Sequence, residues 1–520
     1  MATVLRYRNL AGALALSLML LLAGCAYRAA ESQAAAPPIA ENSSPGSQKL
    51  QESQKSEKLE KHEKAQTSPQ EADQLFHEMN SILQFVSDDT KLPIEHEVKH
   101  KLVSRDEVQK DTEERMKKDK DTKRLEKAEI VLKKFGLVPR DFDLKTYLVS
   151  LLKEQVAGFY STRDKTMYLL NWIPPDQQLE IMSHELTHAL QDQKVDLDQW
   201  LQGDSEITAA EKADDKKKVD PDEDPDLQIR QDEETTARQA VAEGQGMIVM
   251  MDYLLKDSGR TAIQRPDLVE SMKEGMMDGG NFPVFKNAPM YLQESLAFPY
   301  TYGLDFIENV LIKGGKKQAY TGVLENPPVD TREVMEPKAY LSGEVQQPLS
   351  FPSLKNEIGD KYEPYDSGSI GEFDVMVMLK QFSGESTSDR LYPQWRGGGY
   401  WAFKMKDAPQ ENRAGASPTQ SIALIYLSRW ATPQAAQRFA REYAHALTKR
   451  YKSVESAEPA DNATVVPNRW NTEEGTVSIE TNDNMVLALE SFDPETLDKV
   501  RAKIWDFEKS APASLSAATH

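Results

Sequence analysis

Residues 181–193 read Ile181-Met-Ser-His-Glu-Leu-Thr-His-Ala-Leu-Gln-Asp-Gln193 and place two of the chain's eight histidines four positions apart. On a helix, residues i and i+4 lie one above the other, so His184 and His188 present two imidazoles to one point. Glu185 lies about 100° further round the same helix, within reach of a water beside that point. Paired histidines on a surface helix are the alternative, but a chance His-Glu-x-x-His match is rare in a chain with few histidines.

These residue types, in this order, are typical of a catalytic zinc site. Zinc lowers the pKa of a water, and a carboxylate placed like that of Glu185 can accept the proton as general base. Such a site needs a third protein ligand and an open position, whereas a structural zinc is usually closed by four protein ligands. The pattern therefore predicts one Zn²⁺ per chain and hydrolysis of peptide bonds in a peptide or protein substrate.

The third ligand does not follow from local spacing. A third histidine in the close-spaced pattern would require glycine and histidine where this chain has Gln191 and Lys194. The two standard glutamate spacings fall on Ile207 and Thr208, which cannot bind zinc. A more distant residue must therefore complete the site.

Glu243 is our candidate for that ligand. It stands among small and apolar residues in AVAEGQGM, where a buried carboxylate costs heavily unless a cation compensates it. Glu206 and Glu211 are near misses within a strongly acidic stretch that has few core-forming residues. A glutamate at a helix edge is the alternative interpretation of Glu243, and His445 or the acids near Asp232 would then be the next candidates.

Three further positions are candidate site residues. Asp192 continues the helix face of His184 and His188, so it could orient a ligand histidine, although a solvated aspartate at a helix end is an equal alternative. Tyr300 and Tyr302 are candidate donors to the oxyanion that develops during hydrolysis. Residues 395–401, WRGGGYW, are interpreted as a tight turn between strands, with a substrate-binding edge as the alternative.

The N-terminus predicts export and lipidation. A short basic segment precedes an apolar run over residues 10–22, which is too short for an ordinary spanning helix and fits a signal peptide. The run ends in Leu22-Ala23-Gly24-Cys25, which resembles a bacterial lipobox and implies that Cys25 carries the lipid. We therefore expect a lipid-anchored protein of the bacterial cell envelope that faces the periplasm. In Gram-negative lipoproteins, Ala26 after the cysteine would favour the outer membrane. An ordinary secreted protein in which Cys25 occurs by chance is the alternative.

The net charge excludes one class of partner, and the residue patterns predict the fold class. A net charge of -21 argues against nucleic acid as a partner, because phosphate binding needs a basic face. Helical periodicity, a hairpin over 158–170 and a β-α-β-β-α tail predict an α+β fold: a mainly helical domain with a small β-sheet, followed by a small C-terminal α+β module. The expected segments are a signal peptide at 1–24, a disordered tether at 25–70, the main domain at 71–405 with an acidic insertion at 204–234, and the C-terminal module at 406–520.

Several stretches together resemble a family of bacterial and archaeal membrane-associated metallopeptidases of the gluzincin group. They are IMSHELTHALQDQ, AGFYSTRDKTMYLL, AVAEGQG and YLQESLAFPYTYGLDFIENVLIKGG with ENPPVDTREVMEPKAYLSGE, within residues 70–405. The resemblance implies a zincin-like fold in which two helix-borne histidines and a downstream glutamate bind zinc. The long acidic insertion departs from that family.

One alternative function belongs to a different class. A non-catalytic envelope lipoprotein with an assembly or scaffold role could retain zinc without turning over a substrate. Two features favour catalysis: the chain offers three obvious ligands instead of four, and a purely structural site has no use for an acid at Glu185.

Overall fold

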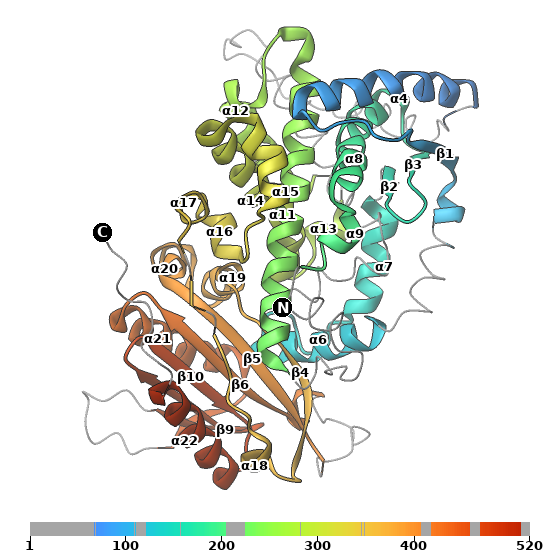
Figure 1. Cartoon of the computed structure of the whole chain (residues 1–520). Helices are drawn as coiled ribbons and strands as arrows, with labels where there is room; N and C mark the ends of the chain where they lie inside the picture. The colour runs from blue at the N-terminus through green and yellow to red at the C-terminus, as the bar shows by residue number, and fades with distance from the viewer. Residues whose placement is uncertain are drawn as a thin grey trace, which may run out of the picture.

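Two long helices, α11 (Pro225–Leu255) and α14 (Met290–Lys317), form the centre of the computed structural model (Figure 1). They cross at glycines. A Cβ atom added at Gly244 would lie 2.1 Å from the carbonyl oxygen of Gly303, and one added at Gly303 would lie 2.1 Å from that of Ala240. No L side chain fits at either position, so these glycines let the two backbones touch.

The structure describes most of the chain after residue 66, and the described part is a mixed α+β protein, as expected. The expected signal peptide, the lipidation site Cys25 and nearly all of the expected tether lie outside the described residues. None of the described helices combines the length and the apolarity needed to cross a lipid bilayer. The described residues are 67, 69–108, 110, 121–155, 158–203, 224–280, 282–344, 346–347, 349–406, 418–457 and 468–510.

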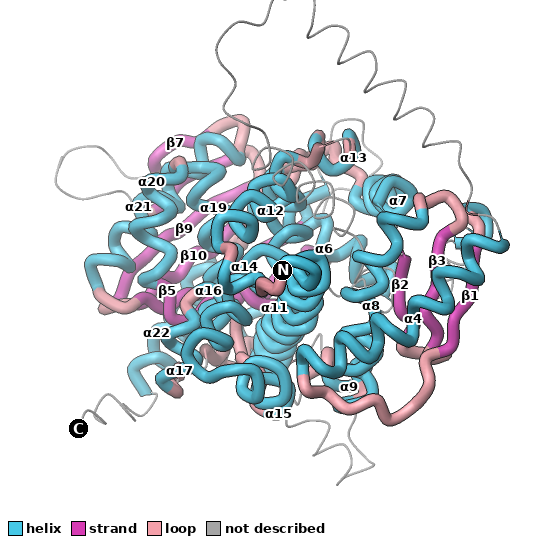
Figure 2. Tube along the Cα trace, turned by 90° about the horizontal axis from the view of Figure 1, so that it is seen from above, coloured by secondary structure: helices cyan, strands magenta, loops and turns pink. Residues whose placement is uncertain are grey.

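The N-terminal third lies on one side of the central helices and carries a three-stranded sheet in the order β1-β3-β2 (Figures 1 and 2). The expected hairpin is confirmed: β2 and β3 pair antiparallel, and Lys165 in their turn has a φ of 55°. Strand β1 pairs parallel to β3. The elements are α4 (Pro69–Thr90), β1 (Lys99–Val103), α6 (Asp121–Phe135), α7 (Leu144–Gln155), β2 (Gly158–Ser161), β3 (Thr166–Leu170), α8 (Pro175–Val195) and α9 (Leu197–Trp200).

Helix α8 carries the opening sequence and is buried between its neighbours. Pro174 precedes it and Pro175 is its first residue, and it ends where Asp196 adopts a left-handed conformation with a φ of 49°. Met182, Leu186 and Leu190 are fully buried, and the helix packs against α4, α11 and strand β2. A helix buried on every side is unusual for a sequence this polar, so its polar residues need partners inside the protein.

Helix α11 begins earlier than expected. The sequence placed residues 225–234 in the acidic insertion, but they form the first turns of α11 and are largely buried. The side chain of Asp224 caps the helix by accepting a hydrogen bond from the backbone N–H of Leu227, and Pro225 occupies the first turn. Asp232 accepts a hydrogen bond from the Ser369 backbone N–H, and Glu233 accepts one from the Thr331 backbone N–H. These hydrogen bonds lower the free-energy cost of burying the two acids.

Short helices connect the central pair: α12 and α13 lie between α11 and α14 in the chain, and α15 to α18 lie between α14 and the C-terminal sheet. Helix α13 lies near α7, while α16 and α17 pack against α14. These elements are α12 (Pro266–Asp278), α13 (Pro283–Lys286), α15 (Val323–Glu325), α16 (Thr331–Met335), α17 (Pro337–Ser342) and α18 (Lys355–Ile358).

A seven-stranded antiparallel sheet lies on the other side of the central helices, in the order β4-β5-β6-β10-β9-β8-β7 (Figures 1 and 2). Its strands come from residues on both sides of position 405, and β5 pairs with β6 along most of its length. The sheet therefore continues across the division at 405 and 406 that the sequence suggested. The elements are β4 (Tyr362–Ser369), α19 (Glu372–Ser383), α20 (Glu385–Leu391), β5 (Trp395–Met405), β6 (Ile422–Trp430), α21 (Pro433–Arg450), β7 (Val454–Ser456), β8 (Arg469–Thr472), β9 (Gly475–Asn482), β10 (Met485–Glu490) and α22 (Pro494–Ser510).

The expectation of a tight turn at WRGGGYW is wrong, because these residues begin strand β5. Its glycines serve close packing instead. A Cβ atom at Gly399 would lie 2.3 Å from the side chain of Ile229, and one at Gly398 would lie 2.5 Å from the carbonyl oxygen of Ile370. Glycine in this strand marks close approach of neighbouring groups.

Helices α21 and α22 cover opposite faces of this sheet. Successive strand residues point to opposite faces, and accordingly Tyr426 joins the core that contains Phe439 of α21, while Ile425 joins the core that contains Leu497 of α22. Thr432 caps α21 through its side chain, and Asp493, just before α22, accepts a hydrogen bond from the backbone N–H of Thr496.

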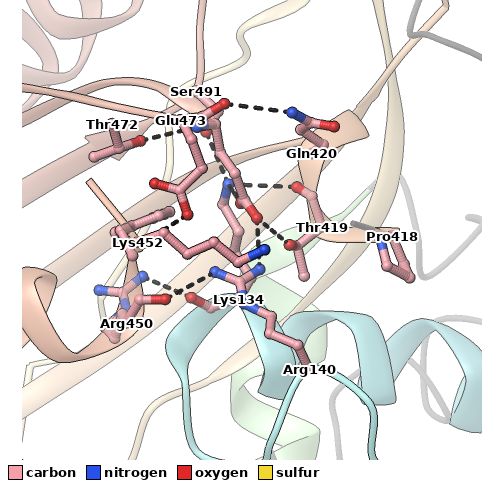
Figure 3. A network of polar contacts seen from close by, with 12 residues as sticks. Lys134, Arg140, Pro418, Thr419, Gln420, Arg450, Lys452, Thr472, Glu473 and Ser491 are labelled. Carbon is pink, nitrogen blue, oxygen red and sulfur yellow. Dashed lines mark hydrogen bonds and ion pairs between the residues drawn. The ribbon is translucent and has the colours of Figure 1, made fainter. Parts of the chain in front are cut away.

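A buried polar network joins the end of α6 to this sheet (Figure 3). Lys134 Nζ lies 2.9 Å from Glu474 Oε2 and donates to Ser491 Oγ at 2.8 Å. Arg450 donates to both carboxylate oxygens of Glu490, at 2.9 and 2.7 Å, and to the Lys134 carbonyl oxygen. Removing one partner of such a buried pair typically costs about 3–5 kcal/mol. The N-terminal third and the sheet are thus held together by more than apolar packing.

Candidate metal centre

The structure brings four of the sequence-predicted site residues together. His184, Glu185 and His188 lie on α8, and Glu243 lies midway along α11, which packs against α8. All four side chains are fully buried. The opening stretch and AVAEGQGM, which are far apart in the sequence, therefore meet at one point inside the protein.

Three ligand-type atoms form a small triangle. Glu243 Oε2 lies 3.1 Å from His184 Nε2 and 3.5 Å from His188 Nε2. The two Nε2 atoms lie 3.0 Å apart. Ligand atoms about 2.0–2.1 Å from a tetrahedral zinc are separated from one another by about 3.3–3.4 Å. The triangle has nearly those dimensions, so these residues fit a zinc ion.

Two further observations support that fit. Glu243 Oε1 is buried and has no hydrogen-bond partner among the described residues. On α11, a Cβ atom added at Gly246 would lie 2.6 Å from the His184 ring, so this glycine makes room for the imidazole. Gly244, two residues earlier on α11, faces α14 instead.

The protonation states follow from burial and mutual charge. Burial lowers the pKa of His184 to about 4, so this imidazole is neutral at physiological pH, as a zinc ligand must be. Burial also opposes a charge on His188, but the Glu243 carboxylate outweighs it and raises the pKa of His188. The pKa of Glu243 is lowered despite burial, because of the charge of His188 and hydrogen bonds to both imidazoles. A buried carboxylate here requires a positive partner.

Glu185 lies beside the triangle and is hydrogen-bonded to the neighbouring strand. The backbone N–H of Tyr160, on β2, donates to Glu185 Oε2 at 2.8 Å. His184, Glu185 and His188 also have ligand-type atoms within 4.8 Å of one another. Glu243 contacts both imidazoles, whereas Glu185 Oε2 is hydrogen-bonded to strand β2, so Glu243 fits the position of a third ligand better than Glu185 does.

A residue that sequence reasoning did not select orients His188. Gln191 Oε1 lies 2.8 Å from His188 Nδ1, and Gln191 Nε2 donates to the Ala242 carbonyl oxygen and to Gln245 Oε1. This amide therefore links the ring of a candidate ligand to the backbone of α11. The sequence feature that could have identified Gln191 is its position three residues after His188, which places it on the same helix face.

Asp192 lies elsewhere. Its carboxylate accepts hydrogen bonds from the Tyr160 hydroxyl at 2.8 Å, from Lys165 Nζ at 2.7 Å and from the Leu197 backbone N–H at 3.0 Å. These contacts fix the β2–β3 hairpin to the end of α8. Asp192 thus supports the strand that holds Glu185. Neither interpretation from the sequence is correct: its described hydrogen bonds do not reach a candidate ligand histidine, and it is not solvated.

The two candidate oxyanion donors differ in position. Tyr300 is buried with its ring roughly parallel to that of His184, with centroids 6.4 Å apart. The Tyr302 hydroxyl contacts Met376 Sδ at 3.1 Å, and burial raises its pKa. Of the two, Tyr300 alone is placed beside the candidate ligands.

The other candidate ligands do not join this group. His445 is exposed on α21, and Asp232 is hydrogen-bonded near the start of α11. Glu206 and Glu211 lie outside the described residues.

Comparison with known proteins adds one finding. Residues 361–501 match a family described as a domain of unknown function (DUF8575). This segment spans β4 to the middle of α22 and so contains all strands of the seven-stranded sheet. Neither a curated protein nor a solved structure matches the chain.

Proposed function

We propose that this protein is a zinc-dependent metallopeptidase in which His184, His188 and Glu243 hold the ion. The observation that carries the proposal is the triangle of His184 Nε2, His188 Nε2 and Glu243 Oε2, with a carboxylic acid, Glu185, next to it but not part of it. Three protein ligands leave one tetrahedral position open, which is typical of catalytic zinc.

When bound, zinc supplies a Lewis acid that polarises the substrate carbonyl and lowers the pKa of water. Glu185 then serves as general base: it accepts a proton from the attacking water and later gives a proton to the leaving amine. The Tyr160 N–H fixes one Glu185 oxygen during these transfers. Tyr300, beside His184, is the better placed of the two tyrosines to donate to the developing oxyanion.

The proposal is tested with the purified full chain, its zinc content and a broad peptide library. We expect close to one zinc per chain, cleavage of some library members, loss of cleavage with a chelator and its return with added zinc. A zinc-loaded chain that cleaves no peptide would contradict the peptidase assignment and favour the non-catalytic envelope lipoprotein.

We further propose that the protein is anchored in the bacterial envelope through lipidated Cys25, facing the periplasm and in the outer membrane. The support is the lipobox-like Leu22-Ala23-Gly24-Cys25 after a short apolar run. Cys25→Ser should move the protein from the membrane to the soluble fraction of cells. Membrane fractionation of Cys25→Ser equal to that of the wild type would rule this anchor out.

A further inference from the structure

A groove lies at the far end of the large sheet, where α21 and α22 flank strands β8 and β9. Its volume is about 410 Å³, within the range of about 300–1,000 Å³ that is typical of small-ligand sites. Its lining contains no residue of α8 or α11, so it is separate from the candidate metal centre. It lies in the segment that matches the family of unknown function.

The floor of the groove is aromatic and apolar. Trp470 is half-buried, and its indole packs partly against the core and partly lines the groove beside Ile479. Among the described residues, neither an aromatic ring nor a cationic group is stacked on this indole. A flat indole face offers apolar contact area to a ligand that carries a flat apolar face of its own.

The polar groups around that floor are not all satisfied. Asn468 Oδ1 is buried and lacks a hydrogen-bond partner within the described part of the chain. A buried acceptor of this kind requires a donor, such as a hydroxyl group. Gln437 and Thr481 are exposed along the rim and add further hydrogen-bonding groups.

The charge of the lining is positive in a strongly acidic protein. Arg501 is paired with Glu480, whereas exposed Arg441 has no ion-pair partner among the described residues. A free guanidinium binds carboxylates with charge-assisted, often bidentate hydrogen bonds. One group of the ligand should therefore be anionic.

A peptide cannot bind in this groove by adding a strand to the sheet. Both β8 and β9 are paired on each side, β8 with β7 and β9, and β9 with β8 and β10. No free strand edge is presented at the floor for a peptide backbone to extend.

We propose that this groove binds a saccharide that carries a carboxylate. The apolar face of a sugar ring would stack on Trp470, a hydroxyl would donate to Asn468 Oδ1, and the carboxylate would pair with Arg441. The site would give the protein a carbohydrate-binding surface that acts independently of the metal centre.

Calorimetric titration of the full chain with trigalacturonate, maltotriose and triglutamate tests the proposal. We expect trigalacturonate to bind more tightly than the other two. Trp470→Leu and Arg441→Gln should each weaken this binding by about tenfold or more, the loss of one charge-assisted contact or one aromatic anchor. Arg438→Gln, on the same helix but outside the lining, should bind like the wild type.

Four results would each contradict the proposal. Absence of trigalacturonate binding rejects the site. Equal binding of maltotriose rejects the role of the carboxylate, and equal binding of triglutamate rejects the saccharide. Wild-type affinity in Arg441→Gln, an exposed substitution that should not disturb folding, rejects the groove as the place of binding. Glu185→Gln should bind trigalacturonate normally, which separates this result from any failure of the peptidase proposal.

Discussion

Glu243 Oε2 lies 3.1 Å from His184 Nε2 although 59 residues separate the two positions and they belong to different helices. The site is therefore built by the packing of α8 against α11, not by a local sequence spacing. We therefore expect the acidic segment between the helices to tolerate changes in length, because only the two helices have to meet.

Glu243→Ala should lower zinc affinity by more than the factor of about 10–100 that changes to residues behind the ligands cause, because it removes a ligand. Competition with a fluorescent zinc chelator measures the change. Glu206→Ala and Glu211→Ala, the rival acids near the standard spacings, are the controls and should bind zinc like the wild type. Wild-type affinity in Glu243→Ala would direct the search for the third ligand elsewhere.

Gln191→Ala and Asp192→Asn should behave differently although the residues are adjacent. Gln191 contacts His188 Nδ1, so its loss should weaken zinc binding by about 10–100-fold. Asp192 holds Tyr160 and Lys165, so its substitution should lower the melting temperature and disturb the strand behind Glu185 with little change in zinc affinity. Equal zinc affinity in both variants would refute the role given to Gln191.

The sequence pattern predicted some residues of the candidate site and could not predict others. The i, i+4 spacing located His184 and His188 on one helix face, and apolar neighbours singled out Glu243 as a carboxylate that needs a cation. Sequence spacing could not separate Gln191 from Asp192, because both lie near the ligand face and the hairpin that captures Asp192 comes from elsewhere in the chain.

Two misjudged segments have a related cause. Residues 225–234 are too acidic to look like core, yet backbone N–H groups of Ser369 and Thr331 satisfy Asp232 and Glu233. The glycines of β5 resemble a turn, yet they accommodate Ile229 and the Ile370 carbonyl. In both cases the partner that makes the local sequence acceptable is distant, so local pattern alone cannot reveal it.

Stability should fall as pH rises, in part because of Glu233. Burial, reinforced by the nearby Asp330 carboxylate, raises the pKa of Glu233 from 4.5 to about 7. The folded state then favours the protonated form, so the contribution is full below pH 4.5 and is lost as pH rises to about 7 and beyond. The loss is on the order of 3 kcal/mol.

Glu233→Gln should therefore unfold at a higher temperature than the wild type at pH 8 and at a similar temperature at pH 4.5. Thermal unfolding followed by circular dichroism checks this. Glu274→Gln, an exposed glutamate on α12, is the matched control and should not show the difference. If Glu233→Gln is as pH-sensitive as the wild type, Glu233 is not the group responsible.

The most direct test of the proposed chemistry is a joint measurement of zinc content and peptide hydrolysis in Glu185→Gln. Glu185 is assigned to proton transfer and not to ligation, so the variant should retain close to one zinc per chain. Its hydrolysis should fall by at least about 10²–10⁴-fold, the usual contribution of a general base. Undiminished hydrolysis by zinc-loaded Glu185→Gln would contradict the account, and so would loss of the metal from that variant.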